Sequence, residues 1–282
     1  MELATIRTAD GATAAAVRRG ERWIGLAAAN LSELLSRTDW SWEATAALAA
    51  SAETGIPGDE ATLELPLPSP RKVICCGLNY ADHILEMGRE LPEYPTLFAK
   101  FADTLTGPTD SISIPASAQG AVDWEAELAV VVGAPLKQAD DDEARAAIAG
   151  YMLANDISMR DWQKRTLQWF QGKAFDATTP LGPVLVTADE IDPDSGIEIS
   201  CEVNGVCRQL GSTKTLAFNP ATLLSYISQF TVLRPGDVVL TGTPGGVGMG
   251  MQPPQYLADG DTVVVEAAGL GRLENTIRFS GN

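Results

Sequence analysis

The sequence predicts a β-rich α+β fold, and three observations lead to this prediction. Short segments rich in Val, Ile and Thr recur along most of the 282-residue chain and end at Gly, Pro or Asp, which is typical of strands. Only two segments of the larger, C-terminal part carry clear helix signals, so strands and helices do not alternate as they do in a doubly wound sheet. The composition, with 45% hydrophobic and 20% charged residues, is that of a globular protein.

Residues 1–68 differ from the rest and are expected to form a small accessory domain with its linker. A hairpin-like segment at 11–26 is followed by Ala-rich, helix-like segments at 26–37 and 41–55. Three prolines in LELPLPSPRK mark the linker. Residues 69–282 are then expected to form the larger domain.

The elements of the larger domain follow from local signals. A helix is expected over 140–150, with acidic residues at its start and Gly150 at its end, and another over 219–230, with Asn219 as N-cap and Pro220 next. Seven segments are expected to be strands: VICCGLNY, ELAVVVGA, YMLANDIS, GPVLVTA, EISCEVNG, DVVLTGT and DTVVVEAAG.

The dipeptide Asn204-Gly205 predicts a two-residue hairpin turn. Such a turn sets Glu202 opposite Cys207, so Cys201 and Cys207 fall on opposite faces and are not expected to form a disulfide. All four cysteines are expected to be reduced, and none of their spacings fits a zinc site.

The charge excludes several classes of partner. With 20 Lys and Arg against 37 Asp and Glu, the formal net charge is −17, which argues against binding to nucleic acid or to an anionic membrane surface. The N-terminal segment has no signal-peptide pattern, and no apolar run approaches the ~18 residues of a membrane span. A cytoplasmic protein is therefore expected.

The stretch VDWEAELAVVVG places two glutamates, Glu125 and Glu127, two positions apart in a strand-like run. On a strand they point the same way, about 6–7 Å apart at their Cα atoms. One interpretation is a solvated edge strand. However, Ala129 and Val131 continue the same face into an apolar run, which favours a buried pair that needs a cation as partner.

Asp156 follows the apolar segment YMLAN, where the chain is expected to leave the core. An Asn-Asp turn is the simpler interpretation. Alternatively, Asp156 joins the two glutamates in an all-oxygen site, and such a site favours Mg²⁺, Mn²⁺ or Ca²⁺ over zinc.

Other candidates for chemistry are scattered along the chain. The single histidine, His83, has Glu86 three residues on, so in a helix a carboxylate could orient the imidazole as a base. The stretch TGTPGGVGMG lacks the context of a nucleotide-binding loop and is interpreted as a tight pocket loop, with Thr243 as a ligand donor. Lys173, flanked by Gly172 and small residues, is either a cation near a ligand or a solvated surface lysine.

Together these stretches resemble the fumarylacetoacetate hydrolase family, in its acylpyruvate-hydrolase-like branch. The resemblance covers roughly residues 70 to 275, and the matching segments lie in family order: GLNYADHILEM, PTLFAK, VDWEAELAVVVG, NDISMRDWQ, GKAFDATTPLGP, VNGVCRQLGST and LRPGDVVLTGTPGGVGMG. It implies the family's mixed-sheet catalytic fold with a small N-terminal domain, and usually a homodimer.

The resemblance also implies roles for individual residues. Glu125, Glu127 and Asp156 match three metal ligands, and the ion expected is Mg²⁺ or Mn²⁺, with Ca²⁺ as an alternative. His83 and Glu86 match a catalytic dyad. The other matches are Lys173, expected in catalysis and substrate binding, Gln163 and Thr243 as substrate contacts, and Arg160 as support for the metal site. The resemblance leaves open whether Lys100 contacts the substrate, because FAKFADTLTGP replaces the Lys-Pro pair of many members.

The function implied is hydrolysis of a C–C bond in a 1,3-diketo acid, through an enolate stabilised by the metal. Acylpyruvates, fumarylpyruvate and 2,4-diketo-3-deoxy acids are candidate substrates, all of them small anionic keto acids. Oxaloacetate decarboxylation, or a related hydratase or isomerase reaction, is the alternative, because the same metal–enolate chemistry serves each of them.

Overall fold

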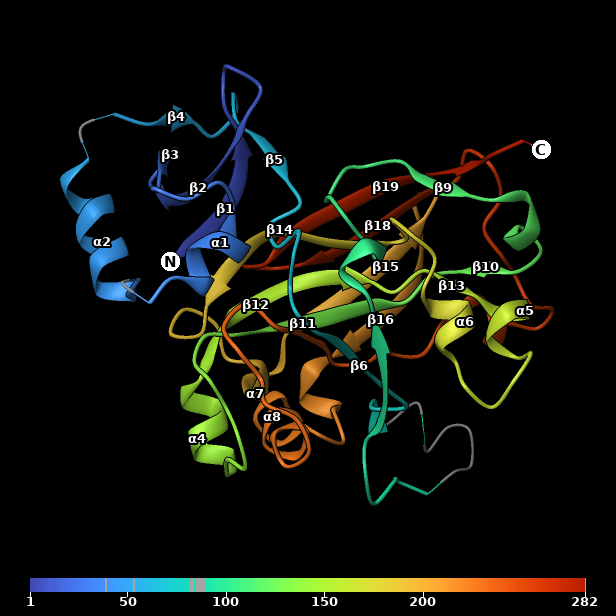
Figure 1. Cartoon of the computed structure of the whole chain (residues 1–282). Coiled ribbons are helices and arrows are strands. Elements are labelled where there is room, and N and C mark those ends of the chain that lie inside the picture. The colour runs from blue at the N-terminus through green and yellow to red at the C-terminus, as the bar shows by residue number, and fades with distance from the viewer. Residues whose placement is uncertain (39, 53, 82–83, 85–89, 282) are drawn as a thin grey trace.

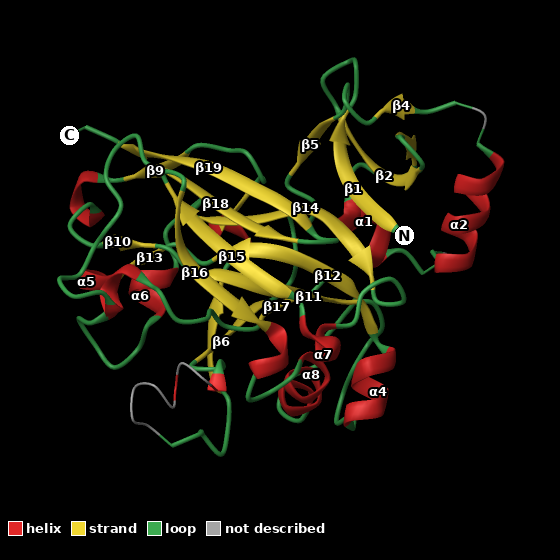
Figure 2. Ribbon diagram, turned by 180° about the vertical axis from the view of Figure 1, so that it is seen from behind, coloured by secondary structure: helices red, strands yellow, loops and turns green. Residues whose placement is uncertain are grey.

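The computed structural model describes residues 1–38, 40–52, 54–81, 84 and 90–281. The proposed dyad of His83 and Glu86 therefore lies outside the described residues. The described chain is rich in strands, with few and short helices, and this confirms the predicted β-rich α+β class (Figures 1 and 2).

A large mixed sheet runs through the molecule in the order β4-β3-β2-β1-β14-β12-β11-β17-β6-β7, and β5 and β8 pair with β1 and β14 beside this path. Its strands are β1 (Glu2–Arg7), β2 (Thr13–Arg19), β3 (Arg22–Gly25), β4 (Ile56–Pro57), β5 (Thr62–Glu64), β6 (Val73–Gly77), β7 (Thr96–Lys100), β8 (Leu105–Thr106), β11 (Ala126–Val132), β12 (Ile148–Asn155), β14 (Thr179–Thr187) and β17 (Val238–Leu240).

A second sheet of five strands has the order β16-β15-β18-β19-β9, and a two-stranded ribbon joins β10 to β13. These strands are β9 (Ile112–Ile114), β10 (Val122–Asp123), β13 (Ser158–Met159), β15 (Glu198–Val203), β16 (Val206–Ser212), β18 (Thr262–Ala267) and β19 (Gly271–Phe279).

The helices are short and lie around the sheets (Figure 1). In both ribbon views α4 and α8 lie side by side at one end of the large sheet. The α-helices are α1 (Leu31–Ser36), α2 (Trp42–Ser51), α4 (Asp141–Ala146), α5 (Arg160–Gln163), α6 (Phe170–Lys173), α7 (Pro193–Gly196) and α8 (Pro220–Ser228), and the 3₁₀ turns are η1 (Ala102–Thr104), η2 (Ala116–Ala118), η3 (Thr213–Thr215) and η4 (Gly248–Gly250).

The two faces of β11 are both buried, and they face different parts of the core. Leu128, Val130 and Val132 belong to the cluster that also contains residues of the five-stranded sheet and of α8. Ala129 and Val131 belong to the cluster on the other face, together with residues of α1. Side chains alternate along a strand, so Glu127 shares its face with the second cluster.

Local signals predicted several ends of elements. Asn219 caps α8 by accepting from the backbone N–H of Thr222, and Pro220 is its first residue. Asn204 and Gly205 adopt φ values of 51° and 75° in the turn between β15 and β16, and Glu202 pairs with Cys207 as predicted. All four cysteines are free.

One predicted helix end is wrong. The helix over 140–150 ends at Ala146, and Gly150 lies inside β12. The reason is the packing of the sheet: a Cβ atom at residue 150 would stand 2.0 Å from the carbonyl oxygen of Val186 on β14. Glycine is therefore present here for close strand contact and not as a helix cap.

The N-terminal strands extend the large sheet, because β1 pairs antiparallel with β14 at Glu2↔Val186 and Leu3↔Leu185. The division into domains at residue 68 stays a prediction.

Within the described residues, no helix is long and apolar enough to cross a membrane.

Candidate active site

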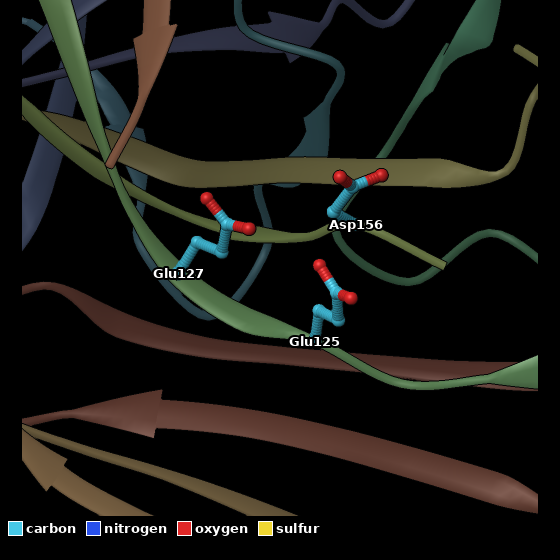
Figure 3. Close-up of side chains that lie close together, drawn as sticks. All are labelled: Glu125, Glu127 and Asp156. Carbon is cyan, nitrogen blue, oxygen red and sulfur yellow. The ribbon is translucent and has the colours of Figure 1, made fainter. Parts of the chain in front are cut away.

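Three carboxylates meet where β11 begins and β12 ends. Ala126 pairs with Asn155 across these strands, so Glu125, Glu127 and Asp156 are brought together, and the N–H of Asp156 donates to the carbonyl oxygen of Glu125 at 2.9 Å. One carboxylate oxygen of each residue lies within 4.8 Å of the others, and Figure 3 shows the three side chains close together. All three residues are buried, which excludes the solvated edge strand.

Two lysines neutralise part of this negative charge. Lys173, at the end of α6, places Nζ 2.6 Å from Oε2 of Glu125 and 2.9 Å from Oδ2 of Asp156. Lys100, at the end of β7, forms an ion pair with Oδ1 of Asp156. Lys173 is only 2% exposed, so the alternative of a solvated surface lysine does not hold.

Glu127 has different interaction partners from Glu125 and Asp156. Its Oε2 accepts from the N–H of Gly242 at 2.7 Å, and no lysine or arginine of the described residues forms an ion pair with it. Burial, and then the charges of Asp156 and Glu125, hold the pKa of Glu127 well above its usual range. Additional positive charge at the site would favour the ionised form of Glu127.

The pKa of Asp156 moves in the opposite direction. Burial alone would raise it, but the charges of Lys100 and Lys173 outweigh burial and hold the pKa below its usual range. Burial likewise acts to lower the pKa of Lys173, but Asp156 and Glu125 raise it, so this lysine is an ammonium ion. Carboxylate oxygens of this number, burial and spacing fit a hard divalent cation, which would balance the charge of Glu127.

Asp123, which sequence reasoning did not single out, connects the carboxylates with the glycine-rich loop. The buried Asp123 accepts from Nε of Arg160 at 2.8 Å, and from the N–H groups of Gly248 at 2.7 Å and Met249 at 3.0 Å. Arg160 in turn pairs through Nη1 with Oε1 of Glu125 at 2.7 Å. One carboxylate therefore fixes both a wall of the site and the arginine that holds Glu125.

Gln209 makes a second such connection. Its Oε1 accepts from the N–H of Ala126, which lies between the two glutamates, and its Nε2 donates to Oγ1 of Thr243 at 2.8 Å. The loop that carries Thr243 is thus tied to the start of β11. The predicted ligand contact Gln163 lies beside Arg160, whose Nη1 donates to its Oε1 at 3.0 Å.

A cavity of about 460 Å³ opens onto these groups. Its lining includes the predicted site residues Glu125, Glu127, Arg160, Gln163, Lys173 and Thr243. Asp156 and Lys100 do not belong to this lining; Asp156 lies beside Glu125 and Glu127, and Lys100 forms an ion pair with it. Apart from the two members of the dyad, the predicted site residues are therefore gathered at one place.

Comparisons with known proteins agree on one protein family. The model of the fumarylacetoacetate hydrolase C-terminal domain matches residues 72–278. A rat protein named as mitochondrial oxaloacetate tautomerase Fahd2a is 45% identical over 223 residues, which cover 79% of this chain and 71% of the relative.

Two solved structures are similar over nearly the whole chain. A 5-carboxymethyl-2-hydroxymuconate delta-isomerase from Mycobacterium smegmatis is 34% identical, with a TM-score of 0.82 and all of both chains covered. A fumarylacetoacetate hydrolase from Exiguobacterium antarcticum is also 34% identical, with a TM-score of 0.84 and coverage of 99% of this chain and 100% of that one. The chain belongs to the fumarylacetoacetate hydrolase family.

Proposed function

We propose that the protein is a divalent-metal-dependent enzyme that interconverts the keto and enol forms of a small anionic 2-oxo acid such as oxaloacetate. The observation that carries this proposal is the buried group of Glu125, Glu127 and Asp156 beside the ammonium of Lys173, at the base of a cavity. The name of the rat relative supports this reaction.

The charges of the site support an anionic substrate. Four buried carboxylates, on Asp123, Glu125, Glu127 and Asp156, stand against three buried cations, on Lys100, Arg160 and Lys173. A bound divalent ion would leave this group with a net positive charge, which an anionic ligand would neutralise.

The three carboxylates would hold Mg²⁺ or Mn²⁺, with Ca²⁺ as an alternative. The ion would supply Lewis acidity, which favours loss of a proton from the carbon next to a keto group. Lys173 would donate a hydrogen bond to the oxygen on which negative charge develops. Nη2 of Arg160 is buried without a hydrogen-bond partner in the structure, and it would donate to the substrate carboxylate together with the amide nitrogen of Gln163.

A second candidate is hydrolysis of the C–C bond of an acylpyruvate, fumarylpyruvate or 2,4-diketo-3-deoxy acid. The spacing of His83 and Glu86 in the sequence favours it, because a carboxylate-oriented imidazole can deprotonate a water molecule. Decarboxylation of oxaloacetate would use the same metal and the same lysine.

We also propose that the protein forms a homodimer and is located in the cytoplasm; the rat relative is named as mitochondrial.

Parallel rate assays distinguish these reactions. We expect Mg²⁺ to accelerate ketonisation of enol-oxaloacetate above its spontaneous rate and a chelator to abolish this effect, with slower turnover of acetylpyruvate. Release of acetate and pyruvate at a higher kcat/KM would make hydrolysis the main reaction, and we would then expect His83→Ala to cost at least ~100-fold. Pyruvate and CO₂ from oxaloacetate would indicate decarboxylation, and an absence of any metal-dependent turnover would contradict the proposal.

A further inference from the structure

Gln209 is a buried glutamine whose amide group links the start of β11 with the glycine-rich loop. It lies on β16 and is 1% exposed. Its Oε1 accepts from the backbone N–H of Ala126 at 2.9 Å. Its Nε2 donates to the carbonyl oxygen of Pro244 at 2.9 Å and to Oγ1 of Thr243 at 2.8 Å. Both polar atoms of this side chain therefore have partners.

The two backbone partners fix the orientation of this amide group. A backbone N–H can only donate and a carbonyl oxygen can only accept, so Oε1 faces Ala126 and Nε2 faces Pro244. The atom that contacts Thr243 is also Nε2, and an amide nitrogen donates hydrogen bonds but does not accept them. The Thr243 hydroxyl group is therefore the acceptor in this contact, and its own proton is left for another group.

Thr243 lies where a ligand could accept that proton. It is only partly buried, and it lines the cavity of about 460 Å³ together with Glu125 and Glu127. Its Oγ1 donates no hydrogen bond to any residue that the structure describes. The preceding residue, Gly242, donates its N–H to Oε2 of Glu127 at 2.7 Å. The residue that offers the proton is thus held beside the carboxylates, where the 2-oxo acid end of a substrate is expected.

Close packing holds the glycine-rich loop against β16. A Cβ atom at residue 246 would stand 2.0 Å from the carbonyl oxygen of Arg208, and one at residue 211 would stand 2.4 Å from Cβ of Pro244. Both positions are glycine, which permits this close approach of two backbone segments. The hydrogen bonds of Gln209 therefore join segments that are already packed together, and Thr243 has little freedom to turn away.

We propose that Gln209 is a positioning residue, which makes the Thr243 hydroxyl group a hydrogen-bond donor to an oxygen atom at the 2-oxo acid end of the substrate. This inference rests on the proposed function and deepens it. A free hydroxyl group can donate or accept, but here Gln209 occupies its oxygen as acceptor before a ligand arrives. Such a preorganised donor stabilises negative charge on the oxygen that it contacts. The site therefore selects a keto, enolate or carboxylate oxygen at this point.

A double-mutant cycle tests this role. Oxalate is an unreactive ligand with the two adjacent oxygen-bearing carbons of a 2-oxo acid, and isothermal titration calorimetry would measure its affinity with Mg²⁺ present. Thr243→Val removes the hydroxyl group at nearly the same volume. We expect it to weaken oxalate binding about 10- to 100-fold, which is the range of a hydrogen bond to a charged group.

Gln209→Glu changes only the direction of the hydrogen bond with Thr243. The new side chain still accepts from the N–H of Ala126, but it offers Thr243 an acceptor in place of a donor. The hydroxyl group would then donate to this carboxylate and no longer to the ligand. We expect oxalate binding to weaken to a similar extent as in Thr243→Val.

The double variant separates positioning from the effect of the added charge. Both single substitutions remove the same hydrogen bond to the ligand, so Gln209→Glu should cost little further affinity when Thr243→Val is already present. Gln209→Met provides the same comparison with a neutral side chain, and it serves alone should Gln209→Glu fail to fold. The control is Gln229→Glu, which makes the same chemical change at an exposed residue after α8 and should bind oxalate as the wild type does.

Three results would overturn the inference. They are wild-type affinity for oxalate in Thr243→Val, wild-type affinity in the Gln209 variants, and a loss from the Gln209 variants that is equally large with and without the Thr243 hydroxyl group. In each case, metal-dependent binding of oxalate to the wild type would leave the proposed function intact. If oxalate did not bind to the wild type in a metal-dependent way, the proposed function would fail, and this inference with it.

Discussion

Replacing Glu127 by Gln or Asp156 by Asn is expected to abolish metal-dependent activity, but only Asp156→Asn is expected to destabilise the metal-free protein near neutral pH. Each substitution removes one carboxylate of the proposed metal site and one formal charge. Asp156→Asn also removes the charge that faces Lys100 and Lys173, two side chains that are almost fully buried. Breaking a buried ion pair by removing one partner costs about 3–5 kcal/mol.

Glu127→Gln removes a carboxylate without breaking an ion pair. Glu127 has a raised pKa in the metal-free protein, so its contribution to stability is fully present below its unfolded pKa of about 4.3 and is lost as the pH rises through the raised value. Asp156 has a lowered pKa, so its contribution is present above its unfolded value of about 3.9 and is lost as the pH falls through the lowered one. Near neutral pH, Glu127→Gln should therefore not destabilise the metal-free protein.

Denaturant unfolding in the presence of a chelator would measure these differences at pH 5 and pH 8. We expect Glu127→Gln to match or exceed the wild type at pH 8, and Asp156→Asn to lose several kcal/mol at both pH values. A large loss of stability in Glu127→Gln would show that this carboxylate is ionised and paired in the metal-free protein, contrary to the arrangement described above.

Replacing Asp123 by Asn is expected to weaken metal binding about 10- to 100-fold, although Asp123 is not one of the proposed ligands. Groups that orient metal ligands typically contribute this much. The substitution removes the charge that holds Nε of Arg160, and Arg160 holds Glu125. It also replaces an acceptor of the N–H groups of Gly248 and Met249, so the wall of the cavity should shift as well.

Titration with Mn²⁺, followed by electron paramagnetic resonance, would measure this affinity directly. The control is Asp110→Asn, which changes an aspartate that accepts from Thr106 and Gly107 in a turn apart from the carboxylate group. Equal Mn²⁺ affinities in Asp123→Asn and the wild type would show that Arg160 positions Glu125 without help from Asp123.

Much of the fold could be predicted, because its signals are local. Segments rich in β-branched residues became β11, β14 and β15, and Asn219 with Pro220 defined the start of α8. The end of α4 could not be predicted in the same way. The identity of Gly150 is explained by a carbonyl group on β14, and local patterns contain no information about strand packing.

The same distinction between local signals and long-range contacts applies to the residues of the candidate site. Two glutamates at i and i+2 before an apolar run indicated a buried charged pair. Local chemistry offered Asp156 and Lys173 as candidates, each beside a simpler interpretation, and the family resemblance assigned their roles and added Arg160. The role of Asp123 and the ion pair of Lys100 with Asp156 were missed, since both depend on contacts between distant segments. Lys100 and Asp156 are 56 residues apart in the sequence, and no local pattern indicates that they form a pair.

The most direct test of the metal centre is a titration of activity with metal. The rate of keto–enol interconversion of oxaloacetate would be followed while Mg²⁺ or Mn²⁺ is added to chelator-treated wild type and to Glu127→Gln. We predict that the wild type regains full activity with one ion bound per chain, and that Glu127→Gln stays folded and inactive throughout. Full activity of the chelator-treated wild type, or the same saturation by metal in Glu127→Gln, would contradict a catalytic ion held by Glu125, Glu127 and Asp156.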